Sequence, residues 1–236
     1  YTTLFRSLNS SLNKAQMDEV RSDLLAGRTK ILYVAPESLT KEENVALLSE
    51  IPISFYAVDE AHCISQWGYD FRPAYLEIAN IRKILPEVPV LALTATATPE
   101  VADDIMSQLH FREGGNCFRM SFERKNLSYV VRRTEDKEGE LIHILRSVPG
   151  SAIVYTRSRQ NTRDVAKMLK SEGITAMYYH AGLTNVDKDV RQEAWLDGEV
   201  RVMVATNAFG MGIDKPDVRL VVHMDAPDSI EAYFQE

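Results

Sequence analysis

Cysteine is scarce in this sequence of 236 residues. Its two cysteines, Cys63 and Cys117, lie far apart and form no C-x-x-C pair. A zinc site with four cysteine ligands and a fold held by several disulfides both need more cysteines than this. Both are therefore excluded, and a reducing compartment is expected.

Long hydrophobic runs are absent as well. No apolar stretch reaches the roughly 18 residues that a membrane-spanning helix needs. The start of the chain lacks the basic-then-apolar pattern of a signal peptide. We expect a soluble intracellular protein without a membrane partner. Because the chain begins at Tyr1 rather than Met and stops at Glu236 inside an expected helix, it is interpreted as a piece of a longer protein.

The sequence also lacks an excess of positive charge. The chain has 27 Lys and Arg against 34 Asp and Glu, which gives a net charge of −7. A general positive field that attracts polyanions needs the opposite balance, so any nucleic-acid contact has to come from a local group of basic residues. With 45% hydrophobic and 26% charged residues, the composition is that of an ordinary globular protein.

The sequence does contain a regular alternation of short apolar runs and longer helical patterns. Continuous apolar runs of this length are typical of buried parallel strands. The runs are 31–35, 55–58, 90–93, 153–155, 176–179, 202–205 and 220–222, and the helical patterns are 14–26, 74–85, 99–109, 159–172 and 185–196. This alternation predicts an α/β fold of parallel sheets flanked by helices. Gly114-Gly115 and the charged stretch 134–139 place a boundary between two α/β units near Met120.

Two acids and an imidazole follow the apolar run 55–58, in the order Asp59-Glu60-Ala61-His62. Ligands of parallel α/β sheets bind at the carboxyl ends of the strands, so residues in this position are candidates for chemistry. An aspartate there can hold a hydrated Mg²⁺ on nucleotide phosphates, and a neighbouring glutamate can orient or deprotonate an attacking water. The alternative is a strand-end turn with solvated acids.

The loop that comes next gathers aromatic residues around an arginine. It contains Trp67, Tyr69, Phe71, Arg72 and Tyr75. Aromatic rings stack on the bases of single-stranded nucleic acid at about 1–3 kcal/mol per base, and a guanidinium pairs with phosphate. Single aromatic residues more often fill a hydrophobic gap. We favour that packing role for Tyr75, which stands at the start of a helix.

Hydroxyls and small residues follow the apolar run 90–93, in the order Thr94-Ala95-Thr96-Ala97-Thr98. Small side chains let other groups approach closely, and Thr98 before Pro99 is expected to cap a helix. Taken in order, D-E-A-H, the aromatic loop and L-T-A-T-A-T resemble the RecQ family of superfamily-2 DNA helicases. The family usually has histidine where Tyr69 stands, which is one departure from its pattern.

The resemblance implies two RecA-like domains, each a parallel sheet flanked by helices. We place them at residues 1–119, a partial ATP-binding domain, and 120–236, a partial C-terminal helicase domain. The implied activity of the longer protein is 3′-to-5′ DNA unwinding coupled to ATP hydrolysis, in DNA recombination and repair. ATP and Mg²⁺ are the implied cofactors, and single-stranded and partially duplex DNA the implied partners. The implied location is the bacterial cytoplasm with its nucleoid, or the nucleus.

The resemblance also assigns roles to residues of the first half. Asp59 would hold Mg²⁺ through water, Glu60 would handle the hydrolytic water, and His62 completes the catalytic motif. The residues implied in DNA binding and in its coupling to ATP are Trp67, Phe71, Arg72, Thr94 and Thr96.

In the second half, Tyr155-Thr156-Arg157-Ser158 follows a strand and opens a helix. Hydroxyls, helix N–H groups and an arginine in this position can face a phosphate. The segment resembles motif IV of the family, which implies that Thr156 and Arg157 contact nucleic acid. Arg159 and Arg163, one helical turn apart, are interpreted as a solvated helix face. His180-Ala181-Gly182, directly after the next strand, resembles a further loop of the family that contacts the nucleic-acid backbone, although a lone histidine in this position is usually structural.

Residues 204–218, VATNAFGMGIDKPDV, form the most specific block of this half. The family pattern implies that Thr206 contacts the nucleic-acid backbone and that Gly210 and Asp214 belong to the nucleotide site. The last residues resemble the opening of motif VI, in which Gln235 is a further nucleotide contact.

The phosphate-binding pattern G-x-x-x-x-G-K-[ST] is absent from the 236 residues. The resemblance places it before Tyr1 and the arginine finger after Glu236. Two alternatives to a RecQ helicase stay open. One is an RNA helicase or double-strand translocase that shares D-E-A-H, and the other is a nucleic-acid-binding module without catalysis.

We predict that the 236-residue chain alone neither hydrolyses ATP measurably nor unwinds DNA. An arginine finger by itself contributes about 10³ to 10⁵ in rate to related phosphoryl transfers, and the phosphate-binding loop is missing as well. The measurement is phosphate release with and without single-stranded DNA. Hydrolysis that single-stranded DNA stimulates would contradict the prediction.

Overall fold

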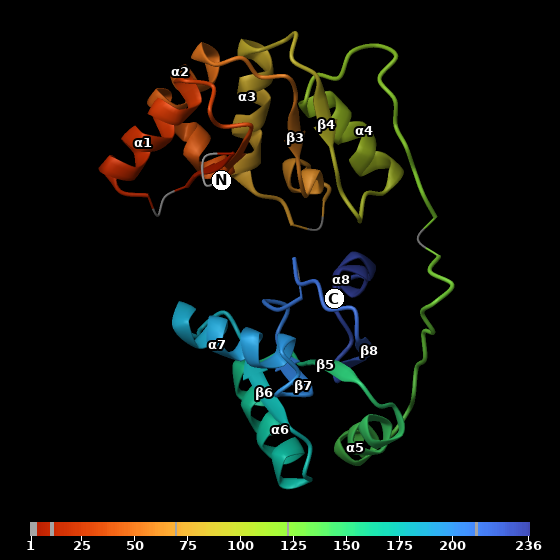
Figure 1. Cartoon of the computed structure of the whole chain (residues 1–236). Helices are drawn as coiled ribbons and strands as arrows, with labels where there is room; N and C mark the ends of the chain where they lie inside the picture. The colour runs from red at the N-terminus through yellow and green to blue at the C-terminus, as the bar shows by residue number, and fades with distance from the viewer. Residues whose placement is uncertain (1–3, 10–11, 69, 122, 211) are drawn as a thin grey trace. The chain divides into compact units, whose positions relative to one another are not determined.

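The computed structural model describes residues 4–9, 12–68, 70–121, 123–210 and 212–236. The chain divides into two compact units, Tyr1–Met120 and Ser121–Glu236. Each is an α/β unit in which parallel strands are flanked by helices (Figure 1). This arrangement confirms the predicted fold class. Among the described residues, no helix is long and apolar enough to cross a membrane.

The first unit contains two separate parallel strand pairs. One joins β1 (Phe5–Leu8) to β2 (Ile31–Val34), and the other joins β3 (Tyr56–Val58) to β4 (Val90–Ala92). Its helices are α1 (Lys14–Leu25), α2 (Glu42–Glu50), α3 (Leu76–Ile84) and α4 (Pro99–Gln108), with short 3₁₀ turns at Pro36–Thr40, Ala61–Ile64 and Pro73–Tyr75.

A buried apolar cluster supports the end of β3. Val58 at the end of β3 and Ile64 in the following 3₁₀ turn belong to this cluster. So do Val101 and Ile105 of α4 and Leu109, which directly follows α4. Thr98 caps α4 by accepting a hydrogen bond from the N–H of Val101, as the sequence predicted. The acidic motif therefore follows a strand whose end is fixed by packing.

The second unit is built on one four-stranded parallel sheet of strand order β6-β7-β5-β8. The strands are β5 (Ser151–Tyr155), β6 (Ala176–Tyr179), β7 (Val202–Ala205) and β8 (Val218–His223). The helices are α5 (Lys137–Ser147), α6 (Arg159–Ser171), α7 (Asn185–Leu196) and α8 (Ile230–Gln235). Both faces of the sheet carry a core, one under α5 and α6 and one around Trp195.

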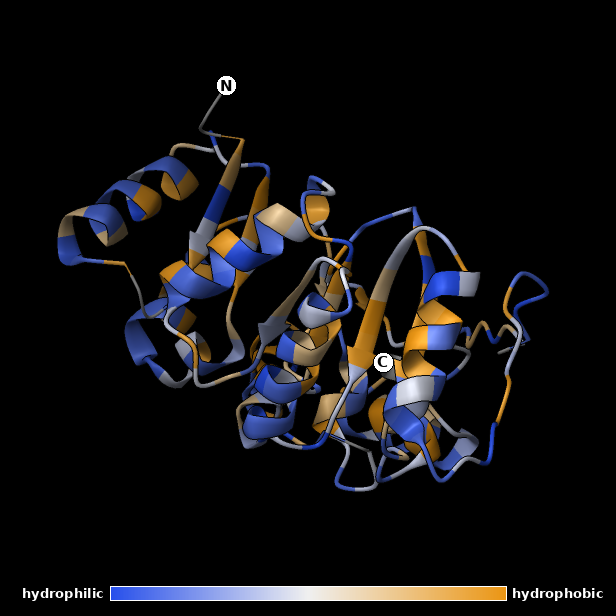
Figure 2. Ribbon diagram, turned by 90° about the horizontal axis from the view of Figure 1, so that it is seen from below, coloured by the Kyte–Doolittle hydropathy of each residue, from blue (hydrophilic) through white to orange (hydrophobic). Residues whose placement is uncertain are grey.

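Hydrophobic residues explain these layers. All residues of β5 and β7 are buried, which is why both strands read as continuous apolar runs. Helix α6 turns Val165, Ala166 and Leu169 toward the sheet and its charged residues outward. Several helices in Figure 2 show this division into a hydrophobic and a hydrophilic side.

Some elements were missed by the sequence analysis, namely β1, α2 and α5. Strand β1, Phe-Arg-Ser-Leu, does not read as an apolar run because it contains Arg6 and a serine. Arg6 is accommodated in the strand because it pairs with the buried carboxylate of Asp23. Helix α5 begins inside the charged stretch 134–139, where Asp136 caps it by accepting from the N–H of Gly139. Its short apolar side consists of Leu141 and Leu145, which are one helical turn apart and buried.

Candidate functional site

The pairing of β3 with β4 brings two sequence motifs together. Val58 lies opposite Ala92, and the ladder continues beyond the strands, with Leu93 N–H donating to Val58 O and Ala61 N–H donating to Leu93 O, both at 2.9 Å. The acidic motif 59–62 and the threonine segment 94–98 therefore leave the sheet side by side. Carboxyl ends of parallel strands are where ligands of such sheets bind.

Glu60 has a left-handed backbone, with φ 48° and ψ 44°. This conformation costs a residue other than glycine about 1–3 kcal/mol and persists only where the surroundings enforce it. Here the N–H of Glu60 donates to Asp59 Oδ1 at 2.9 Å, and the following 3₁₀ turn Ala61–Ile64 is entirely buried. The turn holds Asp59 exposed and Glu60 half-exposed at the strand end.

His62 connects the acids to the threonine segment. Its imidazole is buried, and Nδ1 lies 2.9 Å from Thr94 Oγ1 and 3.3 Å from Glu60 Oε2. Thr94 Oγ1 also accepts from the N–H of Thr96 at 3.3 Å. Burial lowers the pKa of His62, while the Glu60 carboxylate opposes this and raises it. A neutral imidazole in this position can hold the Glu60 carboxylate and the Thr94 hydroxyl in fixed places.

Asp59 and Glu60 suit a magnesium ion shared with a nucleotide. Mg²⁺ takes one or two carboxylates and keeps several waters or substrate phosphates as its other ligands. Among the described residues no group of three or more His, Cys, Asp or Glu forms a metal cage, and an exposed aspartate at a strand end is the donor that this partial coordination needs. The donor set therefore fits Mg²⁺.

The aromatic loop leaves the same buried turn. Trp67 is 81% exposed, and its backbone N–H donates to Ser65 Oγ. The Ser65 hydroxyl in turn donates to Asp104 Oδ2 on α4. Gly68 packs so closely that a Cβ would collide with His62 O. The indole is thus displayed on a turn that is fixed at its base. Tyr69 lies outside the described residues.

Arg72 and Tyr75 tie the far end of this loop to the acidic motif. Arg72 N–H donates to Cys63 O at 2.9 Å, and its guanidinium binds Asp70 Oδ2 through both Nε and Nη2. Tyr75 donates its hydroxyl to Asp59 O at 3.3 Å and packs in the core under β3, in agreement with its expected packing role. Burial raises the pKa of Tyr75 to about 12 and that of Cys63 to about 11, so both stay protonated at neutral pH.

In the second unit, the sheet gathers Thr156, His180 and Thr206 at the carboxyl ends of β5, β6 and β7. Thr156 N–H donates to Ala205 O at 2.9 Å, and Thr206 N–H donates to Tyr179 O at 3.2 Å. Ser158 caps α6 by accepting from the N–H of Asn161. The predicted positions of Thr156 and Thr206 thus come from neighbouring strands, although they are far apart in sequence.

Gly210 is required by a close contact. Its φ is 126°, and a Cβ at this position would collide with the hydroxyl of Tyr155. That hydroxyl donates to Phe209 O at 2.8 Å, which fastens the segment after β7 to β5. Asp214 is exposed further along this segment. Gln235 belongs to α8, but its side chain lies outside the described structure.

Arg157 is exposed and reaches the segment after β8. Its Nη2 donates to Ala226 O at 2.9 Å and lies 3.0 Å from Asp228 Oδ1. Exposed ion pairs contribute about 0–1 kcal/mol, so this pair is easily exchanged for another anion. Arg157 therefore lies near the carboxyl end of β5, and its ion pair with Asp228 is weak enough to be replaced.

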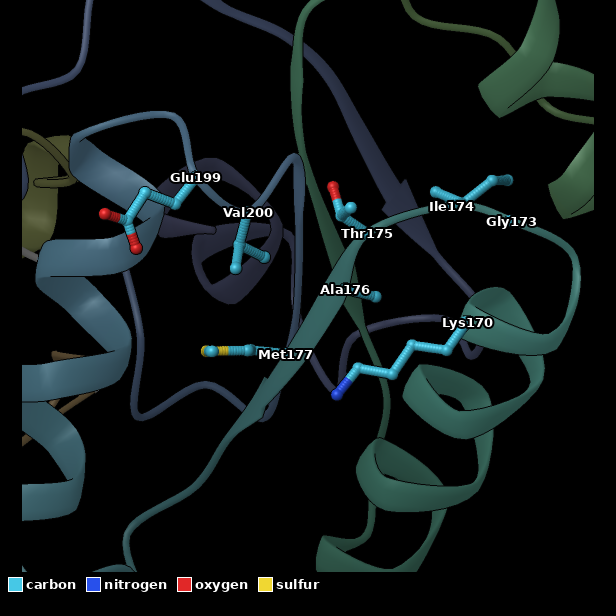
Figure 3. Close-up of a pocket in the computed structure, with 8 residues that line it drawn as sticks. All are labelled: Lys170, Gly173, Ile174, Thr175, Ala176, Met177, Glu199 and Val200. Carbon is cyan, nitrogen blue, oxygen red and sulfur yellow. The ribbon is translucent and has the colours of Figure 1, made fainter.

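A hollow of about 380 Å³ lies elsewhere in the second unit, at the amino ends of β6 and β7. It is lined by Lys170, Gly173, Ile174, Thr175, Ala176, Met177, Glu199 and Val200 (Figure 3). These residues include none of the predicted site residues. Because ligands of parallel sheets bind at the opposite, carboxyl ends, this hollow is not the candidate site.

Comparisons with known proteins agree with this geometry. Residues 2–105 match the family model "DEAD/DEAH box helicase" and residues 136–236 match "Helicase conserved C-terminal domain". The chain is 40% identical over 230 residues to the ATP-dependent DNA helicase RecQ of Pasteurella multocida, covering 97% of this chain and 36% of that protein. It is 41% identical to RecQ of Bacillus subtilis, covering 97% of this chain and 39% of that protein.

Two further matches complete the comparison. A putative ATP-dependent RNA helicase of Acanthamoeba polyphaga mimivirus is 42% identical, covering 95% of this chain and 41% of that protein. Among solved structures, S. cerevisiae Dbp5 L327V bound to RNA and ADP BeF3 aligns with a TM-score of 0.65 at 17% identity, covering 98% of this chain and 66% of that one. The last match shows the fold alone. The chain spans about two fifths of the length of the curated relatives named above.

We predict that the pKa of His62 lies below its ordinary value of 6.5 and falls further in Glu60→Gln, because the carboxylate that raises it is then removed. The folded state disfavours the protonated ring, so stability that is present above pH 6.5 is lost as the pH falls through the folded pKa. NMR titration of the His62 ring measures both values, with Glu113→Gln, an exposed change in the same unit, as the control. A His62 pKa that does not fall in Glu60→Gln would refute the contact, and titration of His62 above 6.5 would refute the dominant effect of burial.

Proposed function

Because this chain belongs to the RecQ family of helicases, we propose that the longer protein is an ATP-dependent DNA helicase that moves 3′ to 5′ on single-stranded DNA. Recombination and repair of DNA are the proposed processes. Residues 1–119 and 120–236 would be parts of its two RecA-like domains. The observation that carries the proposal is the contact of His62 with both Glu60 and Thr94, which connects the acidic strand end to the threonine segment after β4.

The proposed chemistry follows from the positions of the side chains in the first unit. Asp59 would hold Mg²⁺ through water, and the bound ion would neutralise charge on the nucleotide phosphates. Glu60 would accept a proton from the attacking water, and His62 would keep its carboxylate oriented. Since the same turn begins the aromatic loop, a shift of Trp67 or Phe71 on DNA would reach Glu60 through the buried residues 61–64.

The second unit would contribute backbone and nucleotide contacts. Thr156, Arg157 and Thr206 would bind phosphates of the DNA strand, because hydroxyls, N–H groups and a guanidinium meet at the carboxyl ends of β5 and β7. Gly210 and Asp214 would belong to the nucleotide site, and Gln235 would be a further contact. Single-stranded and partially duplex DNA are the proposed partners.

The test of this function is unwinding of matched DNA and RNA duplexes by the full-length protein with ATP and Mg²⁺. Unwinding of DNA with a 3′ overhang supports the proposal. Preference for RNA would favour the alternative suggested by the mimivirus relative's description as an RNA helicase. Binding without any ATP hydrolysis would identify a module that lacks catalysis.

We predict that Glu60→Gln in the full-length protein stops ATP turnover, by at least about 10²-fold, while ATP and DNA binding are retained. Glutamine keeps the size of the side chain but cannot take up the proton of the attacking water. Steady-state ATPase rates and binding by fluorescence anisotropy measure the two effects, with Glu113→Gln as the matched control. Unchanged turnover would remove the proposed role of Glu60.

We predict that Trp67→Ala in the full-length protein abolishes stimulation of ATPase by single-stranded DNA and leaves the unstimulated rate intact. The ring is 81% exposed, so its removal should cost little stability. Trp67→Phe keeps a stacking surface and should retain part of the stimulation. Phe118→Ala, which also removes an exposed ring, is the control. Equal stimulation in Trp67→Ala and Phe118→Ala would show that the loop does not couple DNA to ATP.

A further inference from the structure

Ser65 is the residue from which the aromatic loop begins, and all of its polar groups are used. The residue is 0% exposed. Its N–H donates to His62 O at 3.1 Å, and its carbonyl accepts from the N–H of Gly68 at 3.0 Å. Its hydroxyl accepts from the backbone N–H of Trp67 at 3.2 Å and donates to Asp104 Oδ2 at 2.5 Å. Ser65 therefore closes the tight turn that carries Trp67.

Asp104 reaches this turn from α4, which packs beside it. Val101 and Ile105 of the same helix lie in one buried cluster with Ile64, the residue before Ser65. Asp104 Oδ1 also accepts from Gln108 Nε2 at 3.3 Å, which orients the carboxylate. A hydroxyl that donates to a carboxylate at this short distance forms a charge-assisted hydrogen bond, about twice as strong as a neutral one. The base of the loop is thus held by a side chain from a different element of the unit.

The neighbouring acid of α4 makes no such contact. Asp103 is exposed, and its ion pair within the described residues is with Arg119 at 3.8 Å. The two aspartates have the same charge and lie side by side in the middle of α4. They differ in the hydrogen bond to Ser65, which only Asp104 accepts among the described residues. Asp103 is therefore a matched control for Asp104.

Helix α4 follows directly on the threonine segment, which begins with Thr94. The loop base is held to this one piece of chain at two points. At its start, beside Glu60, the ring of His62 contacts Thr94 Oγ1 at 2.9 Å. At its end, beside Trp67, the serine hydroxyl is bound by Asp104. A buried turn that is fixed at both ends moves as one piece, so a displacement of Trp67 is passed on to Glu60.

We propose that Asp104 is a positioning residue for the coupling of DNA to ATP hydrolysis. Through Ser65 it fixes the turn that displays Trp67, so that contact of the ring with a DNA base reaches Glu60. The proposal rests on the proposed function and deepens it, because it adds a residue of α4 that acts through Ser65. Sequence patterns did not indicate this role, because Asp104 stands within an ordinary helical pattern and its partner is 39 positions away.

The first test uses the 236-residue chain and needs neither DNA nor ATP. The sequence has two tryptophans, Trp67 and Trp195, so a chain labelled with fluorotryptophan gives one fluorine resonance for each, and Trp67→Phe assigns them. Asp104→Ala should shift the resonance of Trp67 and leave that of Trp195, in the second unit, unchanged. Asp103→Ala should shift neither, and thermal melting checks that both variants are folded. A Trp67 resonance that stays unchanged in Asp104→Ala would overturn the positioning role.

The route through the serine is tested by a second set of variants. Ser65→Ala should shift the Trp67 resonance as Asp104→Ala does, and the double variant should add little to either, because both changes remove the same contact. Asp104→Asn keeps one acceptor oxygen for the hydroxyl and should hold the resonance close to its wild-type position. Shifts that simply add in the double variant would overturn the action through Ser65.

The second test measures ATP hydrolysis by the full-length protein. Asp104→Ala should lower the rate at saturating single-stranded DNA by about tenfold, as expected for the loss of one hydrogen bond to a charged group, without raising the KM for ATP. Asp103→Ala should keep the stimulated rate. A rate of Asp104→Ala that falls equally with and without DNA would show a general structural effect and refute the coupling role.

Failure of this proposal and failure of the proposed function give different results. Full DNA stimulation in Asp104→Ala, together with its loss in Trp67→Ala, would overturn the role of Asp104 and leave the helicase function intact. Absence of DNA-stimulated hydrolysis in the wild-type full-length protein would refute the proposed function and the coupling role with it. The resonance of Trp67 would still decide whether Asp104 fixes the loop.

Discussion

The parallel register of β3 and β4 is the constraint on which the first unit depends. It sets Val58 opposite Ala92 and carries the ladder on to Ala61 and Leu93, so the acidic motif and the threonine segment must emerge together. The His62 ring consequently lies between Glu60 and Thr94 and contacts both. The left-handed backbone of Glu60 is the local cost, and the buried turn behind it enforces that conformation.

In the second unit, too, the sheet brings together residues that are distant in sequence, because the order of the strands in the sheet differs from their order along the chain. Because β7 lies between β6 and β5, the carboxyl ends of these strands, Tyr155, Tyr179 and Ala205, lie side by side although they are 24 and 26 residues apart in the chain. Thr156 and Thr206 therefore become neighbours. The Tyr155 hydroxyl fastens the segment after β7, and only glycine at position 210 leaves room for it. Packing inside the sheet thereby fixes the polar residues at its edge.

Local charge, and not the net charge of −7, determines what this protein can bind. Several exposed arginines, such as Arg112, Arg132 and Arg146, are paired with neighbouring acids, and such exposed pairs contribute little. Arg163 and Arg191 instead lie over the ring of Tyr178.

The sequence by itself determined the α/β class, most strands and the identity of the acidic motif, because buried parallel strands read as apolar runs and strand ends carry the polar residues. It missed β1 and α5, because both elements contain polar residues and only a short apolar side. In β1 the arginine pairs with the buried carboxylate of Asp23, and in α5 the short apolar side packs on the sheet. Only the tertiary structure decided that His62 meets Thr94 and that Arg163 and Arg191 both lie over the ring of Tyr178. These contacts join residues up to 32 positions apart, and spacing along a chain says nothing of distances across a sheet.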